Sequence, residues 1–169
     1  MSEKFNIQKV LVAPLDWGLG HATRDISIIR ALINNGYEVI LGAEAAQASL
    51  LRTEFPSLLI LPLPGYHVKY SKNRWTFFWK LMIQVPRLQK IIKEENQWLD
   101  RMINEHRLDL VISDNRFGSY TKKISCFFIT HQLTVKAPFA WAEKMMQRIN
   151  YHFINKFNNC WEHDWAVNN

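Results

Sequence analysis

Cysteine and glycine are scarce in this chain of 169 residues, and long apolar runs are missing. Two cysteines cannot build a disulfide framework, and the apolar run around Cys126 indicates a buried thiol rather than a redox centre. Cys160 and His163 have a metal-like spacing, but two ligands make no site, so we expect no metal. No apolar run approaches the roughly 18 residues that span a bilayer. The polar N-terminus is not a signal peptide either, so the sequence predicts a cytoplasmic protein.

Two common phosphate-binding signatures are also missing. No Gly-Lys-Ser or Gly-Lys-Thr is present, which excludes a P-loop. The stretch from Gly18 has two glycines of the dinucleotide fingerprint, but Thr23 replaces the third, although Glu44 lies near the expected acid position. Because a side chain at that place keeps the helix from approaching the strand closely, we expect no nicotinamide or flavin cofactor.

The remaining composition is that of an ordinary globular domain. Hydrophobic residues make up 48% of the chain and charged residues 21%, so we expect residues 1–169 to form one domain with its own core. Lys and Arg number 21 against 15 Asp and Glu, a net charge of +6. A basic surface attracts phosphate in nucleic acid, nucleotides or lipid headgroups, and the charge alone does not choose among them.

Short apolar runs alternate with amphipathic stretches. We expect strands at 9–13, 37–41, 58–61, 108–113 and 126–130, helices at 22–35, 44–52, 74–106 (interrupted near Pro86) and 138–155, and room for a sixth short strand after Phe157. This alternation requires parallel pairing with right-handed crossovers. The predicted fold is a doubly wound, mostly parallel, Rossmann-like α/β sheet, which binds ligands at the carboxyl ends of its strands.

The first polar strand end covers residues 16–24. Gly18 and Gly20 let backbone amides turn towards an anion, and the following helix presents its positive N-terminus. His21 at the helix start and Arg24 one turn later are placed to meet a phosphate or a sugar hydroxyl. The alternative is a tight turn that needs glycine for its geometry alone.

Two further strand ends carry polar residues. Asp114 directly follows an apolar strand, where it would face the same crevice as His21, and a carboxylate beside an imidazole makes a general base for a hydroxyl. Helix capping by Asp114 and Asn115 is the alternative, and capping does not exclude catalysis. His131 and Gln132 follow the fifth strand and could line the same cleft, although a lone histidine there is often a structural hydrogen bonder.

These strand ends resemble those of GT-B glycosyltransferases, most closely the transferases related to the peptidoglycan N-acetylglucosaminyltransferase (glycosyltransferase family 28). Residues 14–24, 54–56, 112–118 and 129–133 carry the resemblance, which extends from about residue 9 to residue 161. It implies a two-domain hexosyltransferase whose N-terminal domain mainly binds the acceptor and whose C-terminal domain mainly binds the nucleotide sugar. This chain would then be the N-terminal half, inactive without the absent C-terminal domain.

The resemblance also implies roles for single residues. His21 matches a catalytic base that is oriented by an Asp, here Asp114. Gly18 and Gly20 match a loop near the donor diphosphate, with Arg24 in support. No cofactor is implied, because the nucleotide sugar is a substrate. The residues expected on the acceptor side are Asn115, Arg116, His131 and Gln132.

Residues 69–82 interleave large aromatic side chains with Lys and Arg. A helix that presents Trp75, Phe78 and Trp79 near Arg74 suits the inner face of a membrane or a lipid-linked acceptor. Packing of these aromatics onto the sheet is the alternative. Stacking on nucleic acid is a further one, but no nucleic-acid motif accompanies the stretch, so we expect no nucleic-acid partner.

Two functions therefore follow from the sequence. The first is half of an enzyme that transfers a sugar from a nucleotide donor to a hydroxyl acceptor, with His21 as base. The second is a module without catalysis that binds a ligand or anchors a separate catalytic subunit at the membrane.

Overall fold

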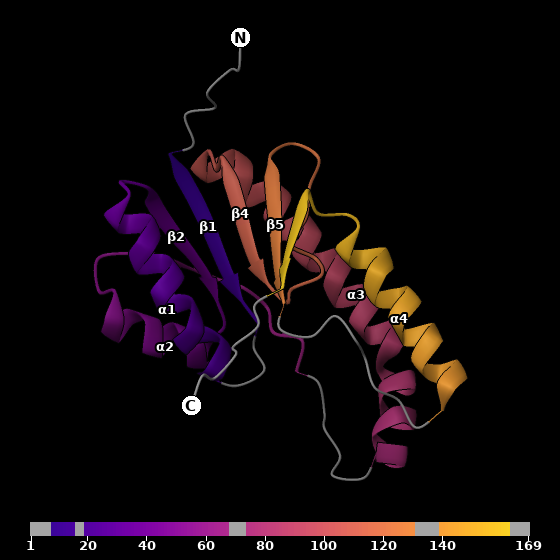
Figure 1. Ribbon diagram of the computed structural model, residues 1–169. Coiled ribbons are helices and arrows are strands. Elements are labelled where there is room, and N and C mark those ends of the chain that lie inside the picture. Colours follow the sequence, from indigo (N-terminus) through magenta and orange to yellow (C-terminus); the bar gives the residue numbers. More distant parts are fainter. Residues whose placement is uncertain (1–7, 16–18, 68–73, 131–138, 163–169) are drawn as a thin grey trace, which may run out of the picture.

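The computed structural model describes residues 8–15, 19–67, 74–130 and 139–162, with the backbone alone described for 19–24, 74–82 and 162. Strands and helices alternate along most of this length (Figure 1). The elements are β1 (Lys9–Pro14), α1 (Leu19–Asn34), β2 (Glu38–Ala43), α2 (Ala45–Glu54), β3 (Leu59–Pro62), α3 (Arg74–His106), β4 (Leu110–Asp114), β5 (Ser125–Thr130), α4 (Ala140–Ile154) and β6 (Asn159–Glu162).

The six strands form one sheet in the order β3-β2-β1-β4-β5-β6, and each neighbouring pair is parallel. The chain builds outwards from β1 in one direction and then crosses over through α3 to build outwards in the other. The predicted doubly wound fold is confirmed. Between β1 and β4 the order reverses, and such a switch point opens a crevice at the carboxyl ends of the strands.

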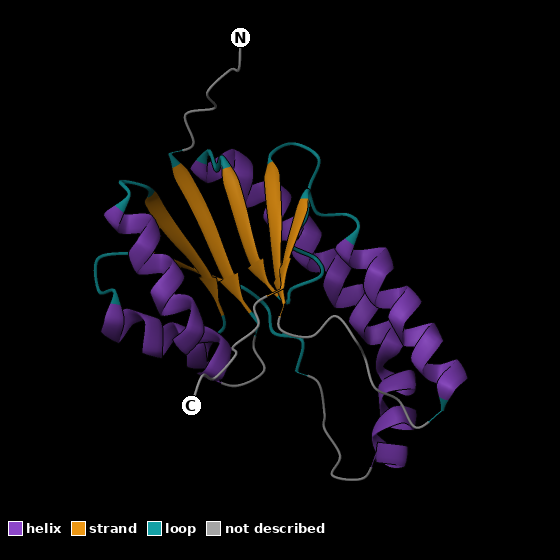
Figure 2. Cartoon of the chain, viewed as in Figure 1, coloured by secondary structure: helices purple, strands orange, loops and turns teal. Residues whose placement is uncertain are grey.

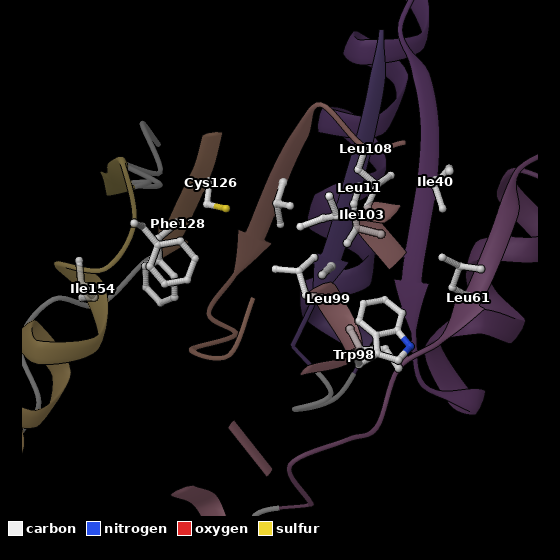
Figure 3. Close-up of a cluster of buried hydrophobic side chains, with 14 residues drawn as sticks. Leu11, Ile40, Leu61, Trp98, Leu99, Ile103, Leu108, Cys126, Phe128 and Ile154 are labelled. Carbon is white, nitrogen blue, oxygen red and sulfur yellow. The ribbon is translucent and has the colours of Figure 1, made fainter. Parts of the chain in front are cut away.

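Helices cover both faces of the sheet, α1 and α2 on one side and α3 and α4 on the other (Figure 2). Successive side chains of β1 point to opposite faces of the sheet, because side chains alternate in direction along a strand. Val10 and Val12 pack with Ile29 of α1 and Leu51 of α2. On the opposite face Leu11 belongs to a separate cluster (Figure 3). That cluster joins β1 to helices α3 and α4 through Trp98, Leu99, Ile103 and Ile154.

Helix α3 runs without a break from Arg74 to His106, so the expected interruption near Pro86 was wrong. A proline inside a helix removes one backbone hydrogen bond. The helix continues because packing on the next turns compensates for that loss: Leu88 and Ile91 contact a small apolar cluster that also touches Phe153 of α4. Among the described helices, none is long and apolar enough to cross a membrane.

Candidate functional site

The strand ends that the sequence marked lie next to one another in the sheet. Pro14, the last residue of β1, is in register with Asp114, the last residue of β4. Asp114 is in turn in register with Ile129 near the end of β5. All three ends therefore lie at the carboxyl edge, across the point where the strand order reverses.

Helix α1 begins at Leu19, three residues earlier than expected. Gly20 and His21 thus belong to the first turn of the helix rather than to the loop before it. Gly18 lies outside the described residues, and so do the side chains of His21 and Arg24. The roles predicted for these residues stay predictions.

Asp114 is fully buried at the end of β4. The chain turns sharply after it, because Asn115 takes a left-handed conformation with φ of 56°, which asparagine tolerates better than most residues. The Asn115 amide donates to the Ile129 carbonyl at 2.9 Å, so this turn is tied to β5. Ser113 closes the turn from the other side, donating from Oγ to the Arg116 carbonyl at 2.7 Å. The carboxyl group of Asp114 is therefore held at the strand edge by a tightly bonded turn.

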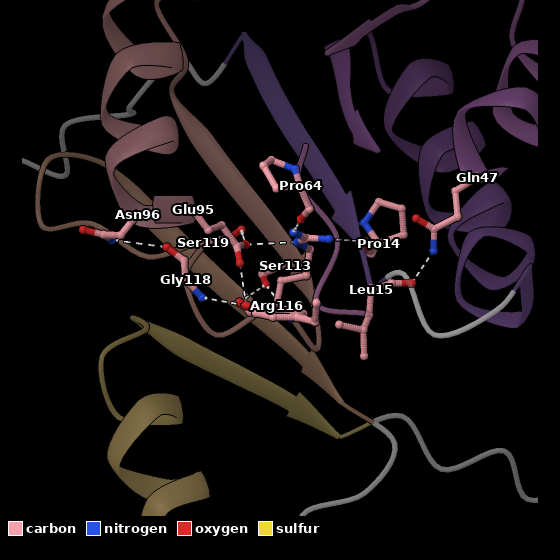
Figure 4. Close-up of polar contacts among 11 residues, drawn as sticks. Pro14, Leu15, Gln47, Pro64, Glu95, Asn96, Ser113, Arg116, Gly118 and Ser119 are labelled. Carbon is pink, nitrogen blue, oxygen red and sulfur yellow. Dashed lines mark hydrogen bonds and ion pairs between the residues drawn. The ribbon is translucent and has the colours of Figure 1, made fainter. Parts of the chain in front are cut away.

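Arg116, which the sequence places on the acceptor side, is surrounded by other groups of the protein. Its side chain is fully buried, and Nε forms an ion pair with Glu95 Oε1 of α3 at 3.0 Å. Nη1 donates to the Pro14 carbonyl at 3.4 Å, and Nη2 donates to the Pro64 carbonyl at 2.5 Å (Figure 4). Direct contact with an acceptor stays a prediction. The contacts in the structure connect the loop after β4 to helix α3, to the end of β1 and to the loop after β3.

Glu95 is surrounded by donors. Oε1 accepts from Arg116 Nε and from the Ser119 hydroxyl, and Oε2 accepts from the Tyr66 hydroxyl. A carboxylate buried away from water needs such partners, because each missing one leaves a desolvation cost. The Arg116 guanidinium also lies over the Tyr66 ring, with Cζ 5.1 Å from the ring centroid. Glu95 thereby fixes the helix α3 to the loop after β4.

Tyr66 is buried beside this ion pair, and its hydroxyl accepts a hydrogen bond from the Gly118 amide. Burial raises the pKa of the Tyr66 hydroxyl well above its usual 10.0, and the negative charge of Glu95 raises it further. Gly118 is required at this contact, since a Cβ there would lie 2.6 Å from the Ile92 carbonyl oxygen. The loop can approach α3 this closely only where a residue has no side chain.

Sequence reasoning missed Glu95 and Tyr66, although a signal for Glu95 was present. Ile92, Trp98 and Leu99 lie three or four positions away from Glu95 on α3 and are all buried. This spacing puts the carboxylate on the apolar face of the helix. A charge on that face requires a buried partner.

A second pair of polar side chains lies at the same edge. Glu44, which follows β2, accepts from His67, which follows β3, at 3.1 Å between Nε2 and Oε1. His67 had no chemical context in the sequence, because its partner is 23 positions away. His131 and Gln132 lie outside the described residues, as do the side chains of Arg74, Trp75, Phe78 and Trp79. Within the part of the chain that is described, no three His, Cys, Asp or Glu residues gather in a group that could hold a metal ion.

No protein-family model and no curated protein sequence matches this chain, whereas solved structures do. The glycosyltransferase SsfS6 from Streptomyces sp. SF2575 aligns with a TM-score of 0.58 at 13% identity, over 85% of this chain and 44% of that protein. MurG from Acinetobacter baumannii aligns with 0.57 at 11% identity, over 95% and 42%. A protein assigned as UDP-N-acetylglucosamine 2-epimerase from Listeria monocytogenes aligns with 0.55 at 11% identity, over 91% and 38%.

The chain has the fold of the N-terminal domain of GT-B glycosyltransferases. It spans less than half the length of each of these three proteins. At such identities the likeness concerns the fold, so the reaction has to be argued from the site.

Proposed function

We propose that this chain is the acceptor-side domain of a glycosyltransferase that moves a sugar from a nucleotide-sugar donor to a hydroxyl group. The observation that carries the proposal is the register of Pro14 with Asp114, which puts the end of β1 beside a buried carboxylate at the switch point. Two of the three aligned proteins are glycosyltransferases, and the third is assigned to a reaction of a nucleotide sugar.

His21 is the proposed general base and Asp114 its orienting carboxylate. Nε2 or Nδ1 of His21 takes the proton of the acceptor hydroxyl, whose oxygen attacks the anomeric carbon while the bond to the nucleotide diphosphate breaks. Asp114 fixes the tautomer of the imidazole and stabilises its protonated form. Attack opposite the leaving group inverts the configuration at that carbon. Loss of the base is expected to cost at least about a hundredfold in rate.

The donor phosphates belong at the start of α1 in this proposal. Gly18 and Gly20 allow the backbone to approach the diphosphate, and Arg24 adds a positive charge. Most contacts to the nucleotide would come from a C-terminal domain, in the same or another chain. Asn115, Arg116, His131 and Gln132 would shape the acceptor side, Arg116 through the loops that it connects.

The experiment is product analysis with common nucleotide sugars and sugar or lipid hydroxyl acceptors. We expect glycosylated acceptor and free nucleotide diphosphate when the chain acts together with a C-terminal nucleotide-sugar domain, and no turnover by the chain alone. A donor sugar released as its 2-epimer would instead support the epimerase reaction assigned to the Listeria protein. Binding without any turnover would support the module that lacks catalysis.

A membrane-facing role has support of its own in α4. This helix exposes Trp141, Ile149 and Tyr151, and it also carries Lys144 and Arg148. Aromatic side chains with neighbouring cations suit the interface of an anionic bilayer. Helix α4 packs on α3, the helix that carries Arg74, Trp75, Phe78 and Trp79, so both would lie on one surface at the inner face of the membrane (Figure 1).

Vesicle sedimentation tests this second proposal on the chain as it is. We expect binding to phosphatidylglycerol vesicles that weakens with salt and drops several-fold in Trp141→Ala. The matched control is Trp161→Ala, because Trp161 is equally exposed but lies on β6. Equal binding by both variants would remove α4 from the contact.

A further inference from the structure

We propose that Arg116 and Gln47 form a two-sided clamp on the end of β1, and that this clamp positions the start of α1 for the reaction at the carboxyl edge. The two side chains bind the successive carbonyl groups of Pro14 and Leu15. Both residues lie within five positions of Leu19, where α1 begins. The catalytic consequence rests on the proposed function, whereas the effect on the backbone does not.

The Arg116 side of the clamp is itself held in place. Nη1 reaches the Pro14 carbonyl while Nε is paired with Glu95 and Nη2 is bound to the Pro64 carbonyl. The guanidinium binds these three partners through three different nitrogens held in one plane, whereas an ammonium group carries all of its donors on a single nitrogen. The end of β1 is thereby tied to helix α3 and to the loop after β3.

Gln47 provides the other side. It is the third residue of α2, its side chain is 2% exposed, and Nε2 donates to the Leu15 carbonyl. Figure 4 shows Gln47 and Arg116 reaching this segment from opposite sides. A glutamine this deeply buried would lose stability without such a bond, because its amide has left water.

Both contacts join residues that are distant in sequence, by 102 positions for Arg116 with Pro14 and 32 for Gln47 with Leu15. They therefore form only when the helices are packed on the sheet. The Leu15 side chain adds a third anchor, since it is buried in a cluster with Tyr66 and Ile92. With its carbonyls and the Leu15 side chain held, the end of β1 is anchored a few residues before α1 begins.

Hydrogen exchange tests the clamp in the chain as it exists. Gln47→Met keeps the length of the side chain and removes the donor, and Arg116→Lys keeps the charge and removes the fork. In both variants we expect exchange at the amides of Leu15 and residues 23–26 to rise roughly fivefold, as loss of one buried hydrogen bond implies. Exchange in β5 should stay within about twofold of the original protein, because packing there is unchanged.

Matched control variants show whether a change in exchange comes from the lost clamp or from the substitution itself. Gln97→Met and Arg30→Lys make the same substitutions at exposed positions and should leave all these amides unchanged. A uniform rise over the whole sheet in Gln47→Met, or no rise at Leu15 and residues 23–26, would overturn the proposal. If Arg116→Lys does not fold, Gln47→Met alone decides.

Catalysis gives a second readout with the C-terminal domain present. Gln47→Met should lower kcat about tenfold, because the base at the start of α1 is misplaced, and should raise the KM for the nucleotide sugar much less, because most donor contacts would come from the C-terminal domain. Equal loss in kcat and affinity for the donor would contradict a positioning role. If the unsubstituted protein transfers no sugar, the proposed function is refuted. The hydrogen-exchange experiment tests the clamp in either case.

Discussion

Glu95 and Arg116 form an ion pair of 3.0 Å between side chains that are both fully buried. One residue lies in the middle of α3 and the other in the loop after β4. Their pairing brings the crossover helix, the switch point and two loops of the carboxyl edge into one polar cluster. Because this cluster holds the backbone beside Asp114, the proposed function and the stability of the fold would depend on the same residues.

Removing one member of the pair should strongly destabilise the protein. Arg116→Met leaves the Glu95 carboxylate buried without its cation, which is expected to cost about 3–5 kcal/mol of the free energy of unfolding. Urea denaturation measures this loss. Arg30→Met, which breaks an exposed pair with Glu54, should change stability by less than about 1 kcal/mol. A loss below 1 kcal/mol for Arg116→Met would mean that the pair contributes no more than a surface contact.

Gly118→Ala should be costly for steric reasons. The added methyl group would lie 2.6 Å from the Ile92 carbonyl oxygen and 2.7 Å from Glu95 Cβ, so the loop would have to move away from α3. We expect a loss of about 1–3 kcal/mol in thermal denaturation. Gly36→Ala is a useful comparison, because there the space is open and only the φ of 83° opposes the substitution. Its expected cost is about 1 kcal/mol. Equal stability of Gly118→Ala and the original protein would contradict the close approach.

Tyr66 should make the protein sensitive to alkali. Its pKa is raised above 10.0 in the folded state, so folding favours the neutral phenol. The resulting stability is complete below pH 10 and is lost as the pH rises through the folded-state pKa. Tyr66→Phe should therefore reduce the loss of stability above pH 10, measured by urea denaturation at stepped pH. The exposed Tyr151→Phe should leave the pH dependence unchanged, and an identical dependence in Tyr66→Phe would rule out this origin.

The two cysteines should differ in reactivity. Burial raises the pKa of the Cys126 thiol to about 11, whereas Cys160 is exposed on β6. Since the thiolate is the reactive form, iodoacetamide at pH 8 should modify Cys160 alone in the folded protein. Mass spectrometry of tryptic peptides locates the label. Modification of Cys126 before unfolding would show that β5 opens in the folded state.

The fold could be predicted because its determinants are local. Each apolar run that was expected to form a strand did so, and the spacing of the runs left room for one helix in each of the first crossovers. The expected interruption of the helix near Pro86 was wrong, because the contacts that decide it are not local. A proline disfavours a helix locally, but the packing of Leu88 and Ile91 that keeps α3 continuous is tertiary.

The candidate site was only partly predictable. Asp114 could be found because it directly follows a buried strand, and its register with Pro14 follows from the topology. Arg116 looked like a ligand contact in a polar loop, because its partner Glu95 lies 21 positions away. Nothing in the sequence indicated that Gln47 is buried, because a glutamine in the first turn of a helix is usually solvated.

The most direct test of the central claim compares the original protein with His21→Ala in sugar transfer, with the C-terminal nucleotide-sugar domain present. The exposed His152→Ala on α4 is the matched control. We expect a fall in kcat of at least about a hundredfold for His21→Ala and no change for His152→Ala. Full transfer by His21→Ala would show that this histidine is not the base and would contradict the proposed mechanism.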